Sequence, residues 1–213
     1  MDKKSVETSV KNEELIRKRR DQMVKAAVKL FTEKGFHRTT TREIAKASGF
    51  SIGTLYEYIR SKDDVLYLVC DDIYRQVNTR IKEKIDVKGD GLACLKDAIA
   101  TYIKIVDEMR SEMLVMYQEA KSLSKESLPY VLNKELEMAG VFEDILGLCV
   151  QSGQIGLAEP EVRFFAQHII VQCQMWTFRR WALRGYTLEE FTQMQINAIM
   201  GGLTSINKAE LSV

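Results

Sequence analysis

The stretch that decides the fold is Thr39–Val65, TTTREIAKASGFSIGTLYEYIRSKDDV. Its run Thr40-Thr41-Arg42-Glu43 has the spacing of a capping box, in which the Thr hydroxyl and the Glu carboxylate satisfy first-turn amides. Gly49 can take the positive φ of a tight turn, and Ser51 is a favoured residue for a new helix start. The stretch therefore predicts two short helices joined by a glycine turn, which is a helix-turn-helix.

Apolar side chains on the two predicted helices face each other. Ile44 and Ala45 on the first helix meet Leu55 and Ile59 on the second, so the opposite face of the second helix is free to enter a DNA major groove. The early residues of this helix then face base edges, and hydroxyl or ammonium groups at the rim reach phosphates. Tyrosines at helical spacing also occur as half-buried packing residues, and this alternative stays open. The base contacts are predicted at Ser51, Ile52, Gly53 and Thr54, and the phosphate contacts at Tyr56, Tyr58 and Lys62.

The charge distribution agrees with a nucleic-acid partner at one end of the chain. Residues 1–62 hold 15 Lys and Arg against 8 Asp and Glu, whereas residues 63–213 hold 16 against 22. Positive charge must lie where the DNA lies, because phosphate neutralisation supplies most non-specific affinity. Basic ends are also common as plain solvated segments, so the charge supports the motif without replacing it.

Helical periodicity extends over nearly the whole chain, and sustained apolar/polar alternation is absent, which predicts an all-α protein. The first helix is expected over Leu15–Lys34, with Gly35 after its end. Ser61 opens a long helix with an apolar stripe that runs from Leu66 to Ile81, and residues 87–91 form the clearest loop. Pro160 fits the first turn of a helix that continues through Trp176 to Trp181, and the last helix runs from Leu188 to about Ile206.

Several classes of protein are excluded by what the sequence lacks. The four cysteines form no CxxC pair and lie in apolar helical patterns, which indicates reduced, buried thiols. There is no signal-peptide pattern and no run of 18 apolar residues, so we expect a soluble, cytoplasmic protein that does not enter a membrane. His168 has no metal-ligand spacing with Glu161 or Glu190, and neither a metal nor a cofactor is expected.

The N-terminal part resembles the DNA-binding domain of the tetracycline-repressor-like (TetR) family. The resemblance lies in the runs AAVKLFTEKGF (26–36), TTTREIA (39–45), SIGTLYEYI (51–59) and SKDDVL (61–66), and covers roughly residues 17–70. Ile59 stands where the family usually has Phe. Residues 1–14 are polar and are predicted to form a disordered arm before a helix-turn-helix domain over 15–62. The resemblance implies a helical ligand-binding and dimerisation domain over 63–213. It implies DNA contacts at Thr40, Thr41, Arg42, Ser51, Ile52, Gly53, Thr54, Tyr56, Tyr58 and Lys62.

The resemblance also implies a homodimer on a palindromic double-stranded operator, with the last two long helices paired with their copies in a four-helix bundle. One face of the final helix agrees, because small residues there allow close helix approach. Alternatively, this face closes the core of the monomer. The face consists of Leu188, Phe191, Gln195, Ala198 and Gly202.

The middle of the second domain is rich in Met and aromatic residues, which line adaptable apolar pockets but also fill ordinary cores. Arg179 and Arg180, next to Trp176 and Trp181, suit an anionic head group; alternatively, they are solvated or pair with acids across the dimer. Because the family includes lipid-responsive members, acyl-coenzyme A is one effector class that the resemblance suggests for an otherwise unknown apolar ligand. The predicted ligand contacts are Met109, Met113, Tyr117, Phe142, Trp176 and Arg179.

Three functions compete at this point. The first is a repressor that an apolar ligand releases from its operator. The second is a dimeric DNA-binding regulator without a small-molecule inducer, controlled by a protein partner or by its own concentration. The third is an enzyme, which the sequence disfavours because it shows no Ser/His/Asp constellation and no phosphate-binding glycine loop.

Overall fold

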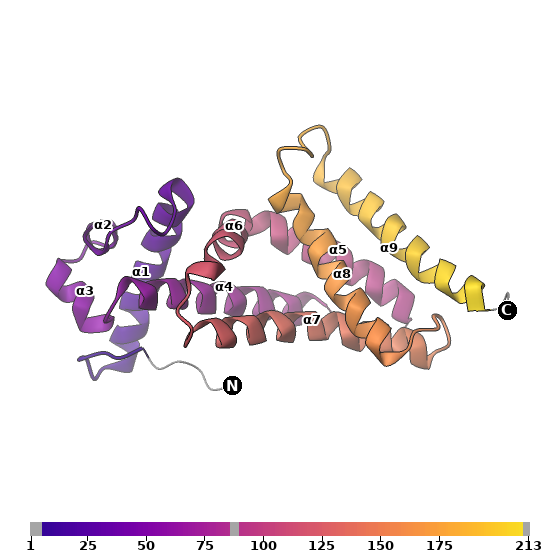
Figure 1. Cartoon of the computed structure of the whole chain (residues 1–213), viewed down its shortest axis with the longest axis horizontal. Helices are drawn as coiled ribbons and strands as arrows, with labels where there is room; N and C mark the ends of the chain where they lie inside the picture. The colour runs from indigo at the N-terminus through magenta and orange to yellow at the C-terminus, as the bar shows by residue number, and fades with distance from the viewer. Residues whose placement is uncertain (1–5, 86–89, 211–213) are drawn as a thin grey trace. The chain divides into compact units, whose positions relative to one another are not determined.

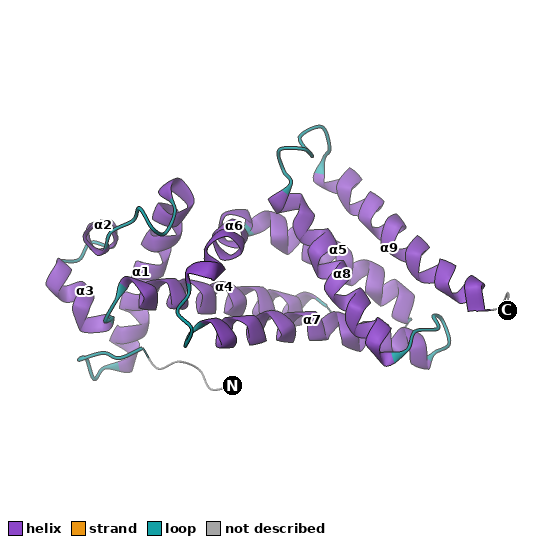
Figure 2. Ribbon diagram, in the orientation of Figure 1, coloured by secondary structure: helices purple, strands orange, loops and turns teal. Residues whose placement is uncertain are grey.

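The structure is a computed structural model that describes residues 6–85 and 90–210, with the side chains of 205–210 left out. The described residues are helical with no strand (Figure 2), which confirms the all-α prediction. In chain order the helices are α1 (Glu13–Lys34), α2 (Thr41–Ala47), α3 (Ile52–Tyr58), α4 (Lys62–Lys84), α5 (Gly91–Glu108), α6 (Arg110–Glu119), the 3-10 helix η1 (Ala120–Ser122), α7 (Leu128–Gln151), α8 (Glu159–Phe178) and α9 (Leu188–Glu210) (Figure 1).

The chain divides into two compact units. The N-terminal unit comprises Met1–Gln76 and Ser111–Glu135, and the C-terminal unit comprises Val77–Arg110 and Leu136–Val213. The unit that holds the helix-turn-helix is therefore larger than the predicted domain over 15–62, because a segment from the middle of the chain joins it. The domain boundary after residue 62 stays a prediction.

The core of the C-terminal unit lies where α5 packs against α8 and α9. Tyr102 of α5 packs edge-on against Phe142 of α7, with ring centroids 5.7 Å apart, and its hydroxyl accepts a hydrogen bond from Gln174 at 3.1 Å. Trp176 of α8 lies 5.0 Å from Phe191 of α9, ring to ring. These aromatic contacts join α5 to α7 and α8 to α9, and buried aromatic pairs add to plain burial of apolar area.

The face predicted for the last helix is divided in the structure. Phe191 and Gln195 are buried within the C-terminal unit, together with Ile199, whereas Ala198 and Gly202 are exposed. A row of residues four apart is inclined to the helix axis, so the buried row moves round the helix and away from these two small residues. The prediction of a single face was wrong because it mixed two neighbouring rows.

The ends of several elements differ from prediction. Helix α8 ends at Phe178, and Trp181 lies exposed in the following loop. Of the predicted loop over 87–91, residues 87–89 lie outside the described part, Asp90 caps α5 and Gly91 begins it.

The predicted disorder over residues 1–14 is wrong for residues 6–14, while residues 1–5 lie outside the described part. Helix α1 begins at Glu13, and Asn12 caps it by accepting the Leu15 N–H at 2.9 Å. The segment before the helix is held because Thr8 donates to the backbone of Glu57 at 2.8 Å.

Candidate nucleic-acid interface

Buried apolar side chains hold α2 and α3 together as the sequence predicts. Ile44, Leu55 and Ile59 are completely buried, and Ala45 nearly so. Gly49 has φ +75° in the turn between the helices, a conformation that L side chains rarely adopt. A seven-residue helix is too short to be stable alone, so this tertiary packing is what fixes α2 and α3.

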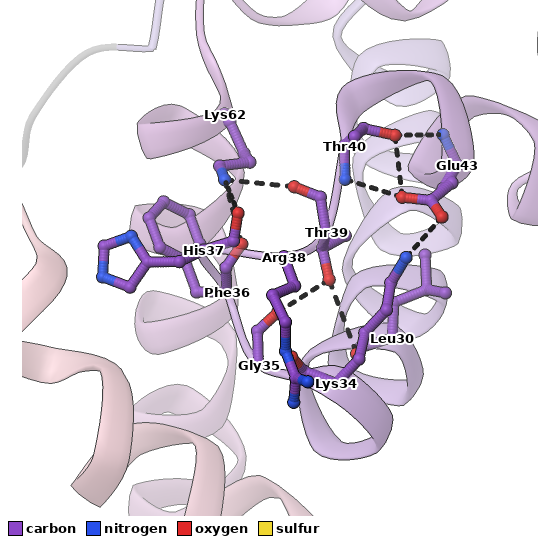
Figure 3. A network of polar contacts seen from close by, with 10 residues as sticks. All are labelled: Leu30, Lys34, Gly35, Phe36, His37, Arg38, Thr39, Thr40, Glu43 and Lys62. Carbon is purple, nitrogen blue, oxygen red and sulfur yellow. Dashed lines mark hydrogen bonds and ion pairs between the residues drawn. The ribbon is translucent and has the colours of Figure 1, made fainter.

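The start of α2 is a complete capping box. The Thr40 N–H donates to Glu43 Oε2 at 2.8 Å, and the Glu43 N–H donates to Thr40 Oγ1 at 3.3 Å (Figure 3). The Lys34 ammonium forms an ion pair with the same carboxylate, which connects the end of α1 to the start of α2. Hydrogen bonds from Lys34 and then from Thr40 lower the pKa of Glu43 to about 2, against a small opposing effect of burial.

Lys62, the first residue of α4, is bonded to the turn between α1 and α2. Its Nζ donates to the carbonyl oxygens of Phe36 at 2.9 Å, Thr39 at 3.0 Å and His37 at 3.4 Å, and it lies 4.2 Å from the centroid of the Phe36 ring (Figure 3). An ammonium group has three N–H donors, and all three have acceptors here. The predicted phosphate contact of Lys62 is therefore replaced by a structural role, because its donors are already used.

The other predicted DNA contacts divide by exposure. Tyr58 is only 3% exposed and packs in the core, which corrects its predicted phosphate contact in favour of the packing alternative. Tyr56 is 45% exposed, and its hydroxyl shares a 3.2 Å hydrogen bond with Thr41, so it connects α3 to α2. Ser51 caps α3 by accepting the Thr54 N–H at 3.0 Å. The exposed or half-buried members of the set are Thr40, Thr41, Arg42, Ser51, Ile52, Gly53, Thr54 and Tyr56.

Two residues that the sequence analysis missed hold the same turn from a distant part of the chain. The Glu119 carboxylate, at the end of α6, accepts the Phe36 N–H at 3.0 Å, and the whole residue is 8% exposed. Ser122 of η1 lies 3.1 Å from His37 Nε2 and hydrogen-bonds to it. No local pattern marks these partners, because more than 80 residues separate them from the turn; a glutamate inside a helical pattern reads as a solvated residue.

Comparison with known proteins agrees with this geometry. Residues 23–67 match the family model of bacterial regulatory proteins of the tetR family. The chain is 27% identical over 191 residues to the HTH-type transcriptional regulator HbdR of Aromatoleum sp. (strain CIB). The aligned region covers 89% of this chain and 82% of the relative. Residues 23–67 of this chain thus form a DNA-binding domain of the TetR type. Helices α2 and α3 form the helix-turn-helix of this matched segment, which is the DNA-binding part of TetR-family regulators.

Two solved structures share the fold of this chain. One is AibR in complex with isovaleryl coenzyme A and operator DNA, with a TM-score of 0.72 and 16% identity over 84% of this chain and 97% of the other. The second is FadR from Bacillus subtilis in complex with stearoyl-CoA, with a TM-score of 0.66 and 22% identity over 84% of this chain and 96% of the other. At these identities the likeness establishes the fold.

The six residues predicted to contact a ligand do not share one unit. Met113 is buried and Tyr117 is 67% exposed, and both belong to the N-terminal unit. Met109, Phe142 and Trp176 are buried in the C-terminal unit, where Arg179 stacks on Trp181 at 4.7 Å. None of the six lines the two cavities described, of about 470 and 350 Å³, which lie beside α1. The predicted ligand site stays a prediction.

The described part of the chain shows no sign of a metal site or of a membrane span. It contains no group of three or more His, Cys, Asp or Glu side chains that could hold a metal ion. None of its helices has the length and apolar character needed to cross a membrane. The four cysteines are buried and free, as predicted, and burial raises the pKa of the Cys149 thiol to about 11.

We expect Glu43→Gln to destabilise this protein in a pH-dependent way. The folded-state pKa lies below the ordinary value of 4.5, so the carboxylate contributes stability above pH 4.5, and this contribution is lost as the pH falls toward about 2. Thermal unfolding of both proteins across this range should show a gap at neutral pH that closes in acid. A gap of constant size, or one that also appears with the exposed control Glu33→Gln, would contradict the assignment.

We expect Lys62→Met to lower the free energy of unfolding by about 1–3 kcal/mol, because three carbonyl groups lose a charged donor. The salt dependence of DNA affinity should not change, since the ammonium is not available to a phosphate. Urea unfolding and DNA titrations at several salt concentrations measure both quantities, with Lys82→Met, an exposed lysine of the same helix within the C-terminal unit, as the matched control. A salt slope reduced by about one with unchanged stability would instead make Lys62 a phosphate ligand.

Proposed function

We propose that this chain is a homodimeric repressor that binds a palindromic operator and leaves it when an apolar small molecule binds its C-terminal unit. The observation that carries the proposal is the exposed polar surface of α2 and α3 on a fully buried helix-turn-helix core. The proposed DNA contacts are Thr40, Thr41, Arg42, Ser51, Ile52, Gly53, Thr54 and Tyr56.

Two features support an acyl-coenzyme A thioester as the effector. Two proteins of the same fold are bound to such thioesters, isovaleryl coenzyme A in AibR and stearoyl-CoA in FadR. The buried interior of the C-terminal unit combines aromatic side chains with Met109 and Met138, and such side chains adapt to apolar chains. Other lipid-like compounds share this chemistry, and they form the comparison set for the test.

Helix α4 is the proposed lever between effector and operator. It is one continuous helix, and its residues belong to the N-terminal unit up to Gln76 and to the C-terminal unit from Val77. Its first residue, Lys62, is bonded to the turn before α2. A ligand that shifts this helix changes the distance between the two recognition helices of a dimer, which must match major grooves about 34–36 Å apart.

Exposed apolar side chains on α8 and α9 support the dimer. Phe164 and Val171 are 64% and 60% exposed on α8, and Met194 is 44% exposed on α9 beside the small residues Ala198 and Gly201. Both helices belong to the C-terminal unit and pack on each other. An apolar surface with small residues is suited to close pairing with a second copy.

We expect Ala198→Arg to convert the dimer into a monomer of 24.4 kDa, because the guanidinium would be buried without a partner in the seam. Sedimentation velocity measures the mass, and circular dichroism checks that the chain is folded. The matched control is Gln193→Arg, an exposed change about 140° away round the same helix. An Ala198→Arg protein that sediments as a dimer would remove this seam from the proposal.

We expect acyl-coenzyme A and operator DNA to weaken each other's binding by the same factor, about 5–150-fold, as thermodynamic linkage requires. The operator would be the duplex most enriched by the protein from a random pool. Calorimetry with stearoyl-CoA and with isovaleryl-CoA, with and without saturating duplex, measures the factor. Free coenzyme A and free fatty acid are the controls. Equal affinities in the two states would reject the acyl thioester as inducer, and they would favour a regulator controlled by a protein partner.

A further inference from the structure

The C-terminal end of the recognition helix α3 is held by a segment outside the helix-turn-helix. A helix leaves its last four carbonyl groups without intrahelical partners, and in a helix of only seven residues these are more than half of the total. Ile59, which follows α3, is extended and turns no N–H back onto the helix. The partners of these carbonyls must therefore come from elsewhere.

Residues 6–9, which precede α1, supply donors to Glu57. Its carbonyl oxygen accepts the Thr8 hydroxyl at 2.8 Å, the Ser9 N–H at 3.0 Å and the Ser9 hydroxyl at 3.3 Å. Thr8 is itself fixed, because its Oγ1 also accepts the Val10 N–H at 3.2 Å. The segment thus caps α3 from outside.

Arg20 of α1 supplies the second cap. Its Nη2 donates to the Tyr58 carbonyl at 3.1 Å and to the Val6 carbonyl at 2.6 Å, so one guanidinium connects α3 to the segment before α1. Its Nε is buried and has no hydrogen-bond partner among the described residues. The Arg20 side chain is half-buried, and its two hydrogen bonds from Nη2 hold the Val6 and Tyr58 carbonyls in place.

The link from α3 to α4 is fixed on its other side. The Asp64 carboxylate, in the first turn of α4, accepts the N–H groups of Arg60 at 2.9 Å and Ser61 at 3.0 Å. Glu7 forms an exposed ion pair with Arg60, with Oε2 and Nε 3.0 Å apart. The direction in which α3 leaves the helix-turn-helix is consequently set by α1, by α4 and by residues 6–9 together.

We propose that Thr8 and Arg20 are positioning residues for operator recognition: they set the direction of α3 and thereby its sequence selectivity, without contacting the bases. The predicted base contacts, Ser51–Thr54, lie at the opposite end of α3 from the capped carbonyls. Base contacts require correct hydrogen-bond geometry, whereas phosphate attraction tolerates small changes in direction. Loss of the caps should therefore weaken selective binding far more than general binding. The inference rests on α3 being the recognition helix.

The test compares Thr8→Val, which removes the hydroxyl donor, with Thr8→Ser, which keeps it. Fluorescence anisotropy gives the affinity for the duplex enriched from a random pool and for a scrambled duplex of the same composition. We expect Thr8→Val to lower the ratio of the two affinities roughly fivefold to tenfold, and Thr8→Ser to restore it. Binding to the scrambled duplex should stay within about twofold of the unmodified protein.

Arg20→Met extends the test, with Lys18→Met as the control that removes an exposed charge from the same helix. Arg20→Met should lower the affinity ratio more than Thr8→Val, and Lys18→Met should leave it unchanged. Amide hydrogen exchange of the unbound proteins should show lost protection confined to α3 in Thr8→Val, a readout that remains informative if Arg20→Met does not fold.

Equal loss of affinity for both duplexes, or unchanged protection of α3 in Thr8→Val, would overturn the inference. Failure of the proposed function has a different signature. In that case the unmodified protein enriches no sequence from the pool, or its operator affinity does not respond to acyl-coenzyme A, while the exchange of α3 still reports on the caps.

Discussion

The DNA-binding part of this molecule depends on the satisfaction of the backbone in one short turn, residues 35–39. Buried or half-buried peptide groups require hydrogen-bond partners, and this turn supplies only part of them itself, such as the Thr39 N–H that donates to the Phe36 carbonyl at 3.1 Å. Here Lys62 donates hydrogen bonds to three carbonyl oxygens of the turn, the Glu119 carboxylate accepts the Phe36 N–H, and the Thr39 hydroxyl donates to the Gly35 carbonyl at 2.9 Å. Because Lys62 belongs to α4 and Glu119 to α6, the position of α2 depends on helices that are not its neighbours in the sequence.

The same principle governs α3. Two turns of helix have little stability of their own, and most of their peptide groups are terminal. The helix is capped at its start by its own Ser51 and at its end by residues 6–9 and Arg20. The two short helices of the helix-turn-helix thus have little stability of their own. Their positions depend on hydrogen bonds and packing from α1, α4, α6 and residues 6–9. Because α4 and α6 supply hydrogen bonds to the turn before α2, a movement of either helix would change the position of the helix-turn-helix.

The parts of the fold that local chemistry specifies were predictable from sequence. The capping box of Thr40 and Glu43, the positive φ of Gly35 and Gly49 and the cap at Ser51 all follow from residue type and spacing. Partners distant in the chain were not predictable. A lysine such as Lys62 is a typical phosphate ligand, and only the structure shows that its ammonium group donates to three backbone carbonyls. Tyr58 and Tyr56 are two residues apart with equal composition, yet tertiary packing buries one and exposes the other. On α9 the small residues Ala198 and Gly202 were predicted to share a face with Phe191 and Gln195. The sequence did not show that the buried row continues to Ile199 and so leaves the small residues exposed.

The contribution of Glu119 and Ser122 to the turn has a consequence for exchanging modules between regulators of this kind. A chimaera joined after residue 62 would carry the complete reading helices and still leave the Phe36 N–H and the His37 ring without their native partners. The recipient body would have to offer a carboxylate and a hydroxyl at equivalent places, or the graft would have to include residues 111–135 as a second, discontinuous piece. A helix-turn-helix of this kind should therefore be exchanged together with residues 111–135, which hold the turn before its first helix.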